Sequence, residues 1–272
     1  MPNFVVMRQK SWTAFFATPY NQGMAKAIFV TIRTGSSRLP QKALAPVTSG
    51  KMALEFILER VSNSKVADLV VVCTTELPED DIIEEIGLAS GIRVFRGSVE
   101  DKLDRWWRAT QENGVSSFVT ADGDDLFCDP GLLDDGLRML SDGDVDFIEA
   151  PDAPCGAFTY GIKTEALARV CEIKKSSDTE MMWVYFKDTN LFKVEQLVID
   201  SSIRRPEYRL TLDYQEDLDF FRRVIDHFDG RSDMSILEIV QFLDSHPDVV
   251  AINAFRQEEF LENQRRRTHL EV

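Results

Sequence analysis

Histidine and cysteine are scarce in this chain, and neither is arranged for catalysis or metal binding. The three histidines, His227, His246 and His269, lie late in the sequence and are scattered. This spacing argues against a histidine-based catalytic triad and against a zinc site built from histidine. The four cysteines form no Cys-x-x-Cys pair, so we expect free thiols in a reducing cytoplasm instead of disulfides or a cysteine zinc site.

The chain also lacks long hydrophobic runs and an excess of basic residues. No apolar stretch approaches the ~18 residues of a membrane-spanning helix, so the sequence predicts no membrane insertion. A formal net charge of −15 argues against nucleic acid or an anionic membrane surface as the main partner. With 272 residues, of which 44% are hydrophobic, the chain is long enough to bury a large core.

Acidic residues are absent from the first 54 positions. Glu55 is the first of 46 acidic residues, and seven basic residues precede it. The residues after position 54 carry only 24 basic side chains, so the positive charge is concentrated near the start of the chain. This distribution favours a binding site for a polyanion, most simply a nucleoside triphosphate. The alternatives are a surface loop with scattered basic residues and an acid-poor targeting peptide.

A short loop within this segment combines glycine, serine and three cations. The apolar run 27–30 predicts a strand, and the segment 35–37, Gly-Ser-Ser, follows it. Backbone N–H groups in such a loop can surround an anion. Arg33, Arg38 and Lys42 add fixed positive charge to the same loop. We therefore expect this loop to bind phosphate groups.

Strand-like and helix-like segments alternate along most of the chain, which is typical of β-α-β units around a parallel sheet. The sequence predicts an α/β fold, a three-layer Rossmann-like sandwich with a mainly parallel sheet. The expected strands are 27–32, 69–74, 92–95, 117–121, 145–149, 156–162 and 209–213. The expected helices are 53–64, 79–90, 100–113, 130–140, 164–174, 215–228 and 235–245, and 178–199 should hold a short helix and a strand.

We expect one domain with an appendage at each end. Residues 1–26 form an N-terminal extension, 27–255 form the domain, and 256–272 form a C-terminal tail. The extension is expected to pack on the domain or to be loosely ordered, in preference to being a cleaved signal. The three arginines at 265–267 are expected to be a solvated helix end.

Acidic side chains follow two of the expected strands. Asp122, Gly123 and Asp124 come after one strand, and Asp213 ends another. Ligands of open α/β sheets bind at the carboxyl ends of the strands. Two aspartates there, facing a cationic loop, suit a magnesium–nucleotide complex, and we expect them to repel each other until a cation binds. The alternative is that these residues only form turns.

Several stretches together resemble a known family. The loop 33–42, Arg-Thr-Gly-Ser-Ser-Arg-Leu-Pro-Gln-Lys, is similar to the signature of the cytidylyltransferases that activate sialic-acid and KDO-type sugars. It is most similar to their spore-coat-polysaccharide branch. The resemblance continues through 95–107, 123–130 and 209–218, and it covers about residues 27–255.

The resemblance is weaker on the side of the acceptor. Gln41 replaces the usual glycine of the loop, and Leu126 replaces a proline. Thr120 stands where an arginine often precedes the Gly-Asp pair. The segment 180–183, Glu-Met-Met-Trp, replaces a Glu-His-Val-Thr stretch. The acceptor is therefore less well indicated than the nucleotide.

The resemblance implies an enzyme that transfers a nucleotidyl group, CMP from CTP, to a sugar or sugar acid and releases pyrophosphate. It implies that Arg33, Arg38 and Lys42 hold the triphosphate and that Asp124 and Asp213 hold Mg²⁺. Asp104 and Arg105 are expected to contact the base or the ribose, unless they are a surface ion pair. The full set of expected nucleotide contacts is Ile32, Arg33, Thr34, Gly35, Ser36, Arg38, Lys42, Thr74, Asp104 and Arg105.

The sequence is also compatible with two other functions, and it predicts a dimer. A glycosyltransferase of similar fold would use Asp122-Gly123-Asp124 to bind its metal, but the three loop cations then exceed what two phosphates require. A non-catalytic nucleotide-sugar binder is the third reading. The segment 157–200 is rich in aromatic residues and methionine, more than a peripheral segment comfortably exposes, so we expect a homodimer formed through it.

Overall fold

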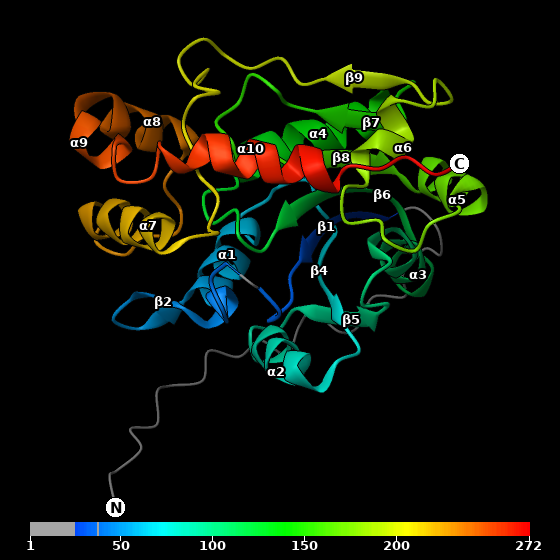
Figure 1. Ribbon diagram of the computed structural model, residues 1–272, viewed down its shortest axis with the longest axis horizontal. Helices are drawn as coiled ribbons and strands as arrows, with labels where there is room; N and C mark the ends of the chain where they lie inside the picture. The colour runs from blue at the N-terminus through cyan, green and yellow to red at the C-terminus, as the bar shows by residue number, and fades with distance from the viewer. Residues whose placement is uncertain (1–24, 37) are drawn as a thin grey trace, which may run out of the picture.

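The computed structural model describes residues 25–36 and 38–272. Seven strands form one sheet in the order β5-β4-β1-β6-β8-β7-β9 (Figure 1). The four strands β5, β4, β1 and β6 run parallel, β8 is antiparallel to both of its neighbours, and β9 is parallel to β7. The expected α/β fold with a mainly parallel sheet is confirmed. Within the described residues, no helix combines the length and apolar character needed to cross a bilayer.

The elements alternate along the chain as expected. The strands are β1 (Ala25–Thr31), β2 (Pro46–Thr48), β3 (Lys51–Met52), β4 (Leu69–Thr75), β5 (Arg93–Gly97), β6 (Val115–Asp122), β7 (Phe147–Glu149), β8 (Tyr160–Lys163) and β9 (Val194–Gln196). The α-helices are α1 (Ala53–Val61), α2 (Asp81–Ala89), α3 (Lys102–Asn113), α4 (Pro130–Asp142), α5 (Thr164–Ile173), α6 (Trp183–Lys187), α7 (Gln215–His227), α8 (Ile236–Ser245), α9 (Pro247–Val250) and α10 (Arg256–Arg267). Short 3₁₀ helices occupy Lys42–Leu44 and Pro78–Asp80, and β2 and β3 form a separate antiparallel pair.

Two hydrophobic cores lie on opposite faces of the sheet. Alternation along β1 sends Ile28 and Val30 to one core and Ala27 and Phe29 to the other. The first core is closed by α1, α2, α4, α7 and α8, and the second by α3, α5 and α6. All four of these β1 side chains are fully buried. Burial on both faces explains the continuous apolar run, which is typical of a central parallel strand.

The N-cap of α3 holds the first turn of this helix in place. Asp101 is the N-cap, and its side chain accepts a hydrogen bond from the backbone N–H of Asp104. The same carboxylate accepts one from the hydroxyl of Thr179 at 3.0 Å. The first turn of α3, with Lys102, is thereby held beside the loop that precedes α6.

The expected strand 209–213 is wrong. The segment is extended but joins no ladder, and only Arg209 forms an isolated bridge, with Cys155. The backbone N–H of Leu210 donates to the carbonyl of Cys155 at 2.7 Å, and that of Leu212 donates to the carbonyl of Asp124 at 2.8 Å. Leu210 and Leu212 are buried in the first core, although the segment lies outside the sheet.

Several aromatic and methionine side chains of the segment 157–200 are buried, whereas Leu191 and Val198 are exposed. Met182, Tyr185 and Phe186 are buried in the second core, where the ring of Phe186 stacks on that of Phe147 with centroids 4.8 Å apart. These buried side chains support the core and not an interface, and the homodimer through this segment stays a prediction. Of the expected N-terminal extension, 1–24 lie outside the described residues, and the remaining two residues begin β1.

Candidate active site

Two adjoining cavities open at the carboxyl ends of β1 and β6. The loop cavity, about 170 Å³, is lined mainly by the segment after β1 and the turn after β6. The helix cavity, about 380 Å³, lies between that turn, the segment 150–160 and helix α10. Six residues line both cavities and are called the shared rim: Arg38, Lys102, Asp122, Asp124, Glu180 and Arg267.

The loop cavity carries an excess of positive charge although the whole chain is acidic. Its lining includes six basic side chains, and only three acidic ones oppose them. The basic side chains are Arg33, Arg38, Lys42, Lys102, Arg105 and Arg267. A concave surface of this sign attracts anions, and low-dielectric walls strengthen that attraction. The cavity is therefore suited to a polyphosphate.

A buried carboxylate anchors the start of the loop after β1. The backbone N–H and the hydroxyl of Thr34 both donate to Oδ1 of Asp80, each at 2.7 Å. The hydroxyl of Thr75, at the end of β4, donates to the other oxygen. Burial acts to raise the pKa of Asp80, but these hydrogen bonds outweigh it and lower the pKa below its usual range. The charged Asp80 thus fixes Thr34 to the neighbouring strand.

Lys42 joins the two aspartates that the sequence singled out. Its Nζ lies 2.5 Å from Oδ2 of Asp124 and 2.9 Å from Oδ1 of Asp213. Burial acts to lower the pKa of Lys42, but the charges of these two carboxylates raise it above its usual value. The expectation that Asp124 and Asp213 repel each other until a cation binds is therefore wrong, because the ammonium group of Lys42 lies between them.

Asp213 is surrounded by cations. Arg38 donates to its Oδ1 at 2.5 Å, and the buried Arg209 donates to its Oδ2 at 3.2 Å. Burial acts to raise the pKa of Asp213, but Lys42 and Arg38 lower it to about 2. Arg209 is held in turn by Asp217, whose two oxygens accept from its guanidinium at 2.8 Å each.

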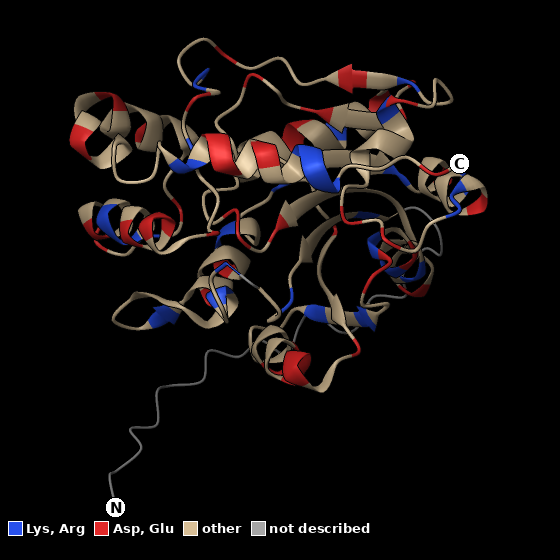
Figure 2. Cartoon of the chain, viewed as in Figure 1, with Lys and Arg blue, Asp and Glu red and all other residues tan. Residues whose placement is uncertain are grey.

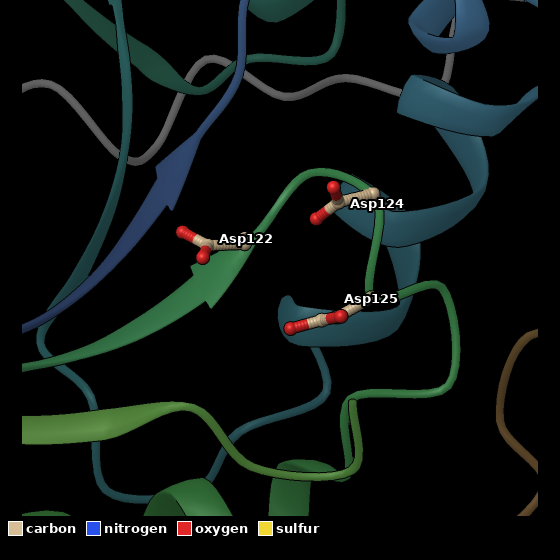
Figure 3. A group of neighbouring side chains, drawn as sticks. All are labelled: Asp122, Asp124 and Asp125. Carbon is tan, nitrogen blue, oxygen red and sulfur yellow. The ribbon is translucent and has the colours of Figure 1, made fainter. Parts of the chain in front are cut away.

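Three carboxylates gather in the turn that ends β6 (Figure 3). Asp122 ends the strand, and Asp124 and Asp125 follow in the turn, with ligand oxygens within 4.8 Å of one another. Burial raises the pKa of Asp122. The ammonium group of Lys102, whose Nζ lies 3.1 Å from Oδ1 of Asp122, offsets only part of this increase. Burial and the charges of its two neighbours raise the pKa of Asp125 well above its usual range. A divalent cation would relieve this crowding of negative charge, and oxygen ligands are those that Mg²⁺ prefers.

Gly123 is required for a close approach between the two strands that carry the site. A Cβ placed on Gly123 would lie 2.4 Å from Cδ1 of Ile32 and 2.5 Å from its Cβ. The N–H of Gly123 donates to the carbonyl of Thr31 at 2.8 Å. The absence of a side chain here lets the loop after β1 and the turn after β6 face each other.

The structure brings together most of the residues expected from the sequence. The loop cavity or the helix cavity is lined by Ile32, Arg33, Gly35, Ser36, Arg38, Lys42, Arg105, Asp124 and Asp213. Thr34 lies behind this lining as the anchor described above. Thr74 is buried in β4, and Asp104 pairs with the exposed Arg108 at 2.9 Å, so neither reaches the cavities. Their contact with a nucleotide stays a prediction that the structure does not support.

Sequence reasoning missed four residues of the site. Lys102 is the first residue of α3 and belongs to the same motif as Asp104. Lys102 lines the cavities, whereas Asp104 does not. Asp125 directly follows the Asp122-Gly123-Asp124 triplet, and this position in the sequence could have identified it as part of the site. Glu180 lies 3.5 Å from Arg33, and Arg267 belongs to the three arginines at 265–267 that the sequence predicted to be a solvated helix end. Glu180 had a sequence signal, because it matches the glutamate of the family stretch compared with 180–183, whereas Arg267 had none.

Comparison with known proteins gives matches over most of the chain. A family model described as cytidylyltransferase matches residues 27–266. The chain is 31% identical over 226 residues to the spore coat polysaccharide biosynthesis protein SpsF of Bacillus subtilis (strain 168). That alignment covers 80% of this chain and 94% of the relative.

Solved structures share the fold. A cytidylyltransferase from Leptospira borgpetersenii serovar Hardjo-bovis (strain JB197) has a TM-score of 0.76 and 27% identity, covering 84% of this chain and 97% of that one. CMP:2-keto-3-deoxy-manno-octonic acid synthetase complexed with CTP has a TM-score of 0.58 and 15% identity, covering 75% and 99%. A Mycobacterium tuberculosis H37Rv protein in complex with manganese has a TM-score of 0.53 and 13% identity, covering 73% and 97%. The last two similarities show the fold alone.

Proposed function

Because this chain belongs to the cytidylyltransferase family, we propose that it transfers CMP from CTP to a sugar or sugar-acid acceptor in polysaccharide biosynthesis and releases pyrophosphate. The resemblance drawn from the loop 33–42 is confirmed by the family match, and the chain is a nucleotidyltransferase. The observation that carries the proposal is the juxtaposition of the cationic loop cavity with the carboxylates after β6.

The loop cavity supplies the charge that a triphosphate requires. Arg38 and Lys42 lie in it and would neutralise the phosphates that leave as pyrophosphate. Among the described residues, and apart from its chain neighbours, Gly35 has no atom within 4 Å of the place where its Cβ would be, so the backbone there leaves room for a ligand. The acceptor hydroxyl oxygen attacks the α-phosphorus and loses its proton to solvent, while the bond from that phosphorus to the oxygen shared with the β-phosphate breaks and pyrophosphate leaves.

The carboxylates after β6 fit a divalent metal ion. Asp122, Asp124 and Asp125 would hold it, with Asp213 close by through the shared contact to Lys42. When bound, such an ion polarises phosphate oxygens and neutralises charge that develops on them. Magnesium is our choice because it commonly binds through one or two carboxylates together with substrate phosphates. The manganese complex of a protein of the same fold supports a divalent ion.

The helix cavity adjoins this site and is large enough for an acceptor. Its lining mixes charged groups with apolar ones such as Met181, Trp183 and Phe260. The shared rim is where an acceptor oxygen and the α-phosphorus would meet. We place the reaction in the cytoplasm, where CTP is made and where the four free cysteines would stay reduced.

The family assignment decides against the glycosyltransferase alternative for the Asp122-Gly123-Asp124 triplet. A non-catalytic nucleotide-sugar binder would release no pyrophosphate, so measurement of that product distinguishes it from the proposed enzyme.

The proposal is tested by pyrophosphate release from the purified full chain. Each of the four nucleoside triphosphates is combined with 2-keto-3-deoxy-manno-octonic acid, a sialic acid or a neutral sugar, with Mg²⁺ or with a chelator. We expect release that depends on CTP, on the acceptor and on Mg²⁺, and Lys42→Ala should abolish it. Failure of wild-type protein to bind CTP by isothermal titration, or preference for a nucleotide-diphosphate sugar, would overturn the proposal.

A further inference from the structure

The C-terminal helix α10 reaches the cavities from the side opposite the loop after β1. In Figure 1 it runs in front of the sheet, from the side of α9 towards the end of the chain. Figure 2 shows that basic residues gather at its C-terminal end. Of these, Arg267 lies on the shared rim, so one arginine of α10 borders both the loop cavity and the helix cavity.

Arg267 differs from the other five basic side chains of the loop cavity. Arg33, Arg38, Lys42 and Lys102 each pair with a carboxylate, and Arg105 donates to the carbonyl of Ser98 at 2.5 Å. Within the described residues, the guanidinium of Arg267 makes no hydrogen bond and no ion pair within 4 Å, although its charge helps to lower the pKa of the Glu180 carboxyl on the same rim. An arginine on a cavity wall with its donors free is suited to bind an anion of a ligand.

Helix α10 is mounted on the part of the chain that carries Asp213. Arg256 pairs with Glu216 at 2.8 Å, and Gln257 accepts from Arg209 at 3.4 Å. The guanidinium of Arg209 also lies over the ring of Phe260, 4.7 Å from its centroid. Arg209 itself is fully buried and contacts Asp213. The position of α10 is therefore fixed relative to the phosphate-binding side chains that Asp213 holds.

We infer that Arg267 is a further catalytic residue of the transfer, binding the α-phosphate of CTP from the side of the acceptor. The inference rests on the proposed function. The α-phosphate must lie where the two cavities meet. The acceptor attacks it from the helix cavity, and pyrophosphate departs into the loop cavity. The family match ends at Arg266, one residue earlier, so it assigns no role to Arg267.

The test compares two arginines of the same helix. Arg265 and Arg267 are both exposed, but they are about 200° apart around the helix axis, and Arg265 lines neither cavity. Arg267→Ala and the control Arg265→Ala therefore remove the same charge from opposite faces. Binding of CTP in the presence of Mg²⁺ and without acceptor is measured by isothermal titration, with Arg38→Ala as the positive control.

We expect Arg267→Ala to weaken CTP binding by about 10- to 100-fold, as for the loss of a charge-assisted contact. Arg265→Ala should bind CTP as the wild type does, and Arg267→Lys should recover part of the loss. The melting temperatures of these variants should match, since neither side chain is buried. CTP binding by Arg267→Ala within twofold of wild type, while Arg38→Ala is impaired, overturns the inference but leaves the proposed function intact. A normal affinity for CTP with a raised KM for the acceptor would likewise overturn it. If wild type does not bind CTP, the proposed function itself is overturned.

Discussion

Replacement of Asp213 by asparagine should destabilise the protein, although it removes one of several crowded carboxylates. Asp213 is almost fully buried, and its charge is balanced by Lys42 and two arginines. Its pKa is lowered from the ordinary 3.8 to about 2, which corresponds to about 2 kcal/mol of stability at neutral pH. Asparagine cannot carry this charge. We expect Asp213→Asn to lower the free energy of unfolding by roughly that amount.

The pH dependence gives the prediction a second, independent signature. A carboxylate with a lowered pKa in the folded state contributes stability above its unfolded pKa, and this contribution is lost as the pH falls towards the folded pKa. For Asp213 the loss begins near pH 3.8 and is largely complete near pH 2. The difference in stability between wild type and Asp213→Asn should therefore be constant between pH 7 and pH 5 and should shrink below pH 4.

The assay is urea unfolding followed by circular dichroism at several pH values, without nucleotide or metal. A matched control is Asp219→Asn on α7, because the Asp219 side chain is 55% exposed and its nearest arginine is 3.9 Å away. The control should change stability by less than about 0.5 kcal/mol. Equal stability of Asp213→Asn and wild type at pH 7 would refute the reasoning, as would a difference that persists unchanged at pH 3.

Three further changes test other parts of the site. Arg38→Ala should weaken CTP binding by about 1.5–3 kcal/mol in isothermal titration, since a charge-assisted contact to a polyphosphate is lost; an unchanged affinity would contradict a phosphate role. Gly123→Ala should cost roughly 1–3 kcal/mol of stability in thermal unfolding, because its Cβ would overlap Ile32, and a melting temperature equal to wild type would show that the loops can separate freely. Asp124→Asn should remove most of the Mg²⁺-dependent pyrophosphate release, and full activity in this variant would end the metal-site hypothesis.

The sequence was sufficient for the parts of the site that are local in the chain. The loop after β1 and the turn after β6 each follow a strongly apolar strand, and the carboxyl ends of parallel strands meet at one edge of a sheet. The sequence alone therefore predicts that Arg38, Lys42 and Asp124 lie together. Their mutual ion pairs could not be predicted, because no sequence pattern shows that Lys42 lies between two carboxylates.

The sequence did not predict the positions of the segment 209–213 and of helix α10, because both positions depend on tertiary contacts. The segment 209–213 has the composition of a strand, but its partners are the loop carbonyls of Cys155 and Asp124, so burial alone was misleading. Helix α10 is strongly polar and has no buried residue, which made it resemble a solvated tail. Its place at the helix cavity follows from its contacts to Arg209, which lies some 50 residues earlier in the chain.

The ion pair between Lys42 and Asp124 has a consequence for how ligands bind together. Under the proposed function, a divalent ion needs Asp124 and a triphosphate needs Lys42, so each ligand must break the same contact. The first ligand to bind bears the cost of separating the two side chains, and the second finds its partner already free. Metal and nucleotide are then thermodynamically linked, each raising the affinity for the other by the same factor. Lys42 thereby makes the empty site a poor receptor for either ligand alone and a good one for the two as a complex.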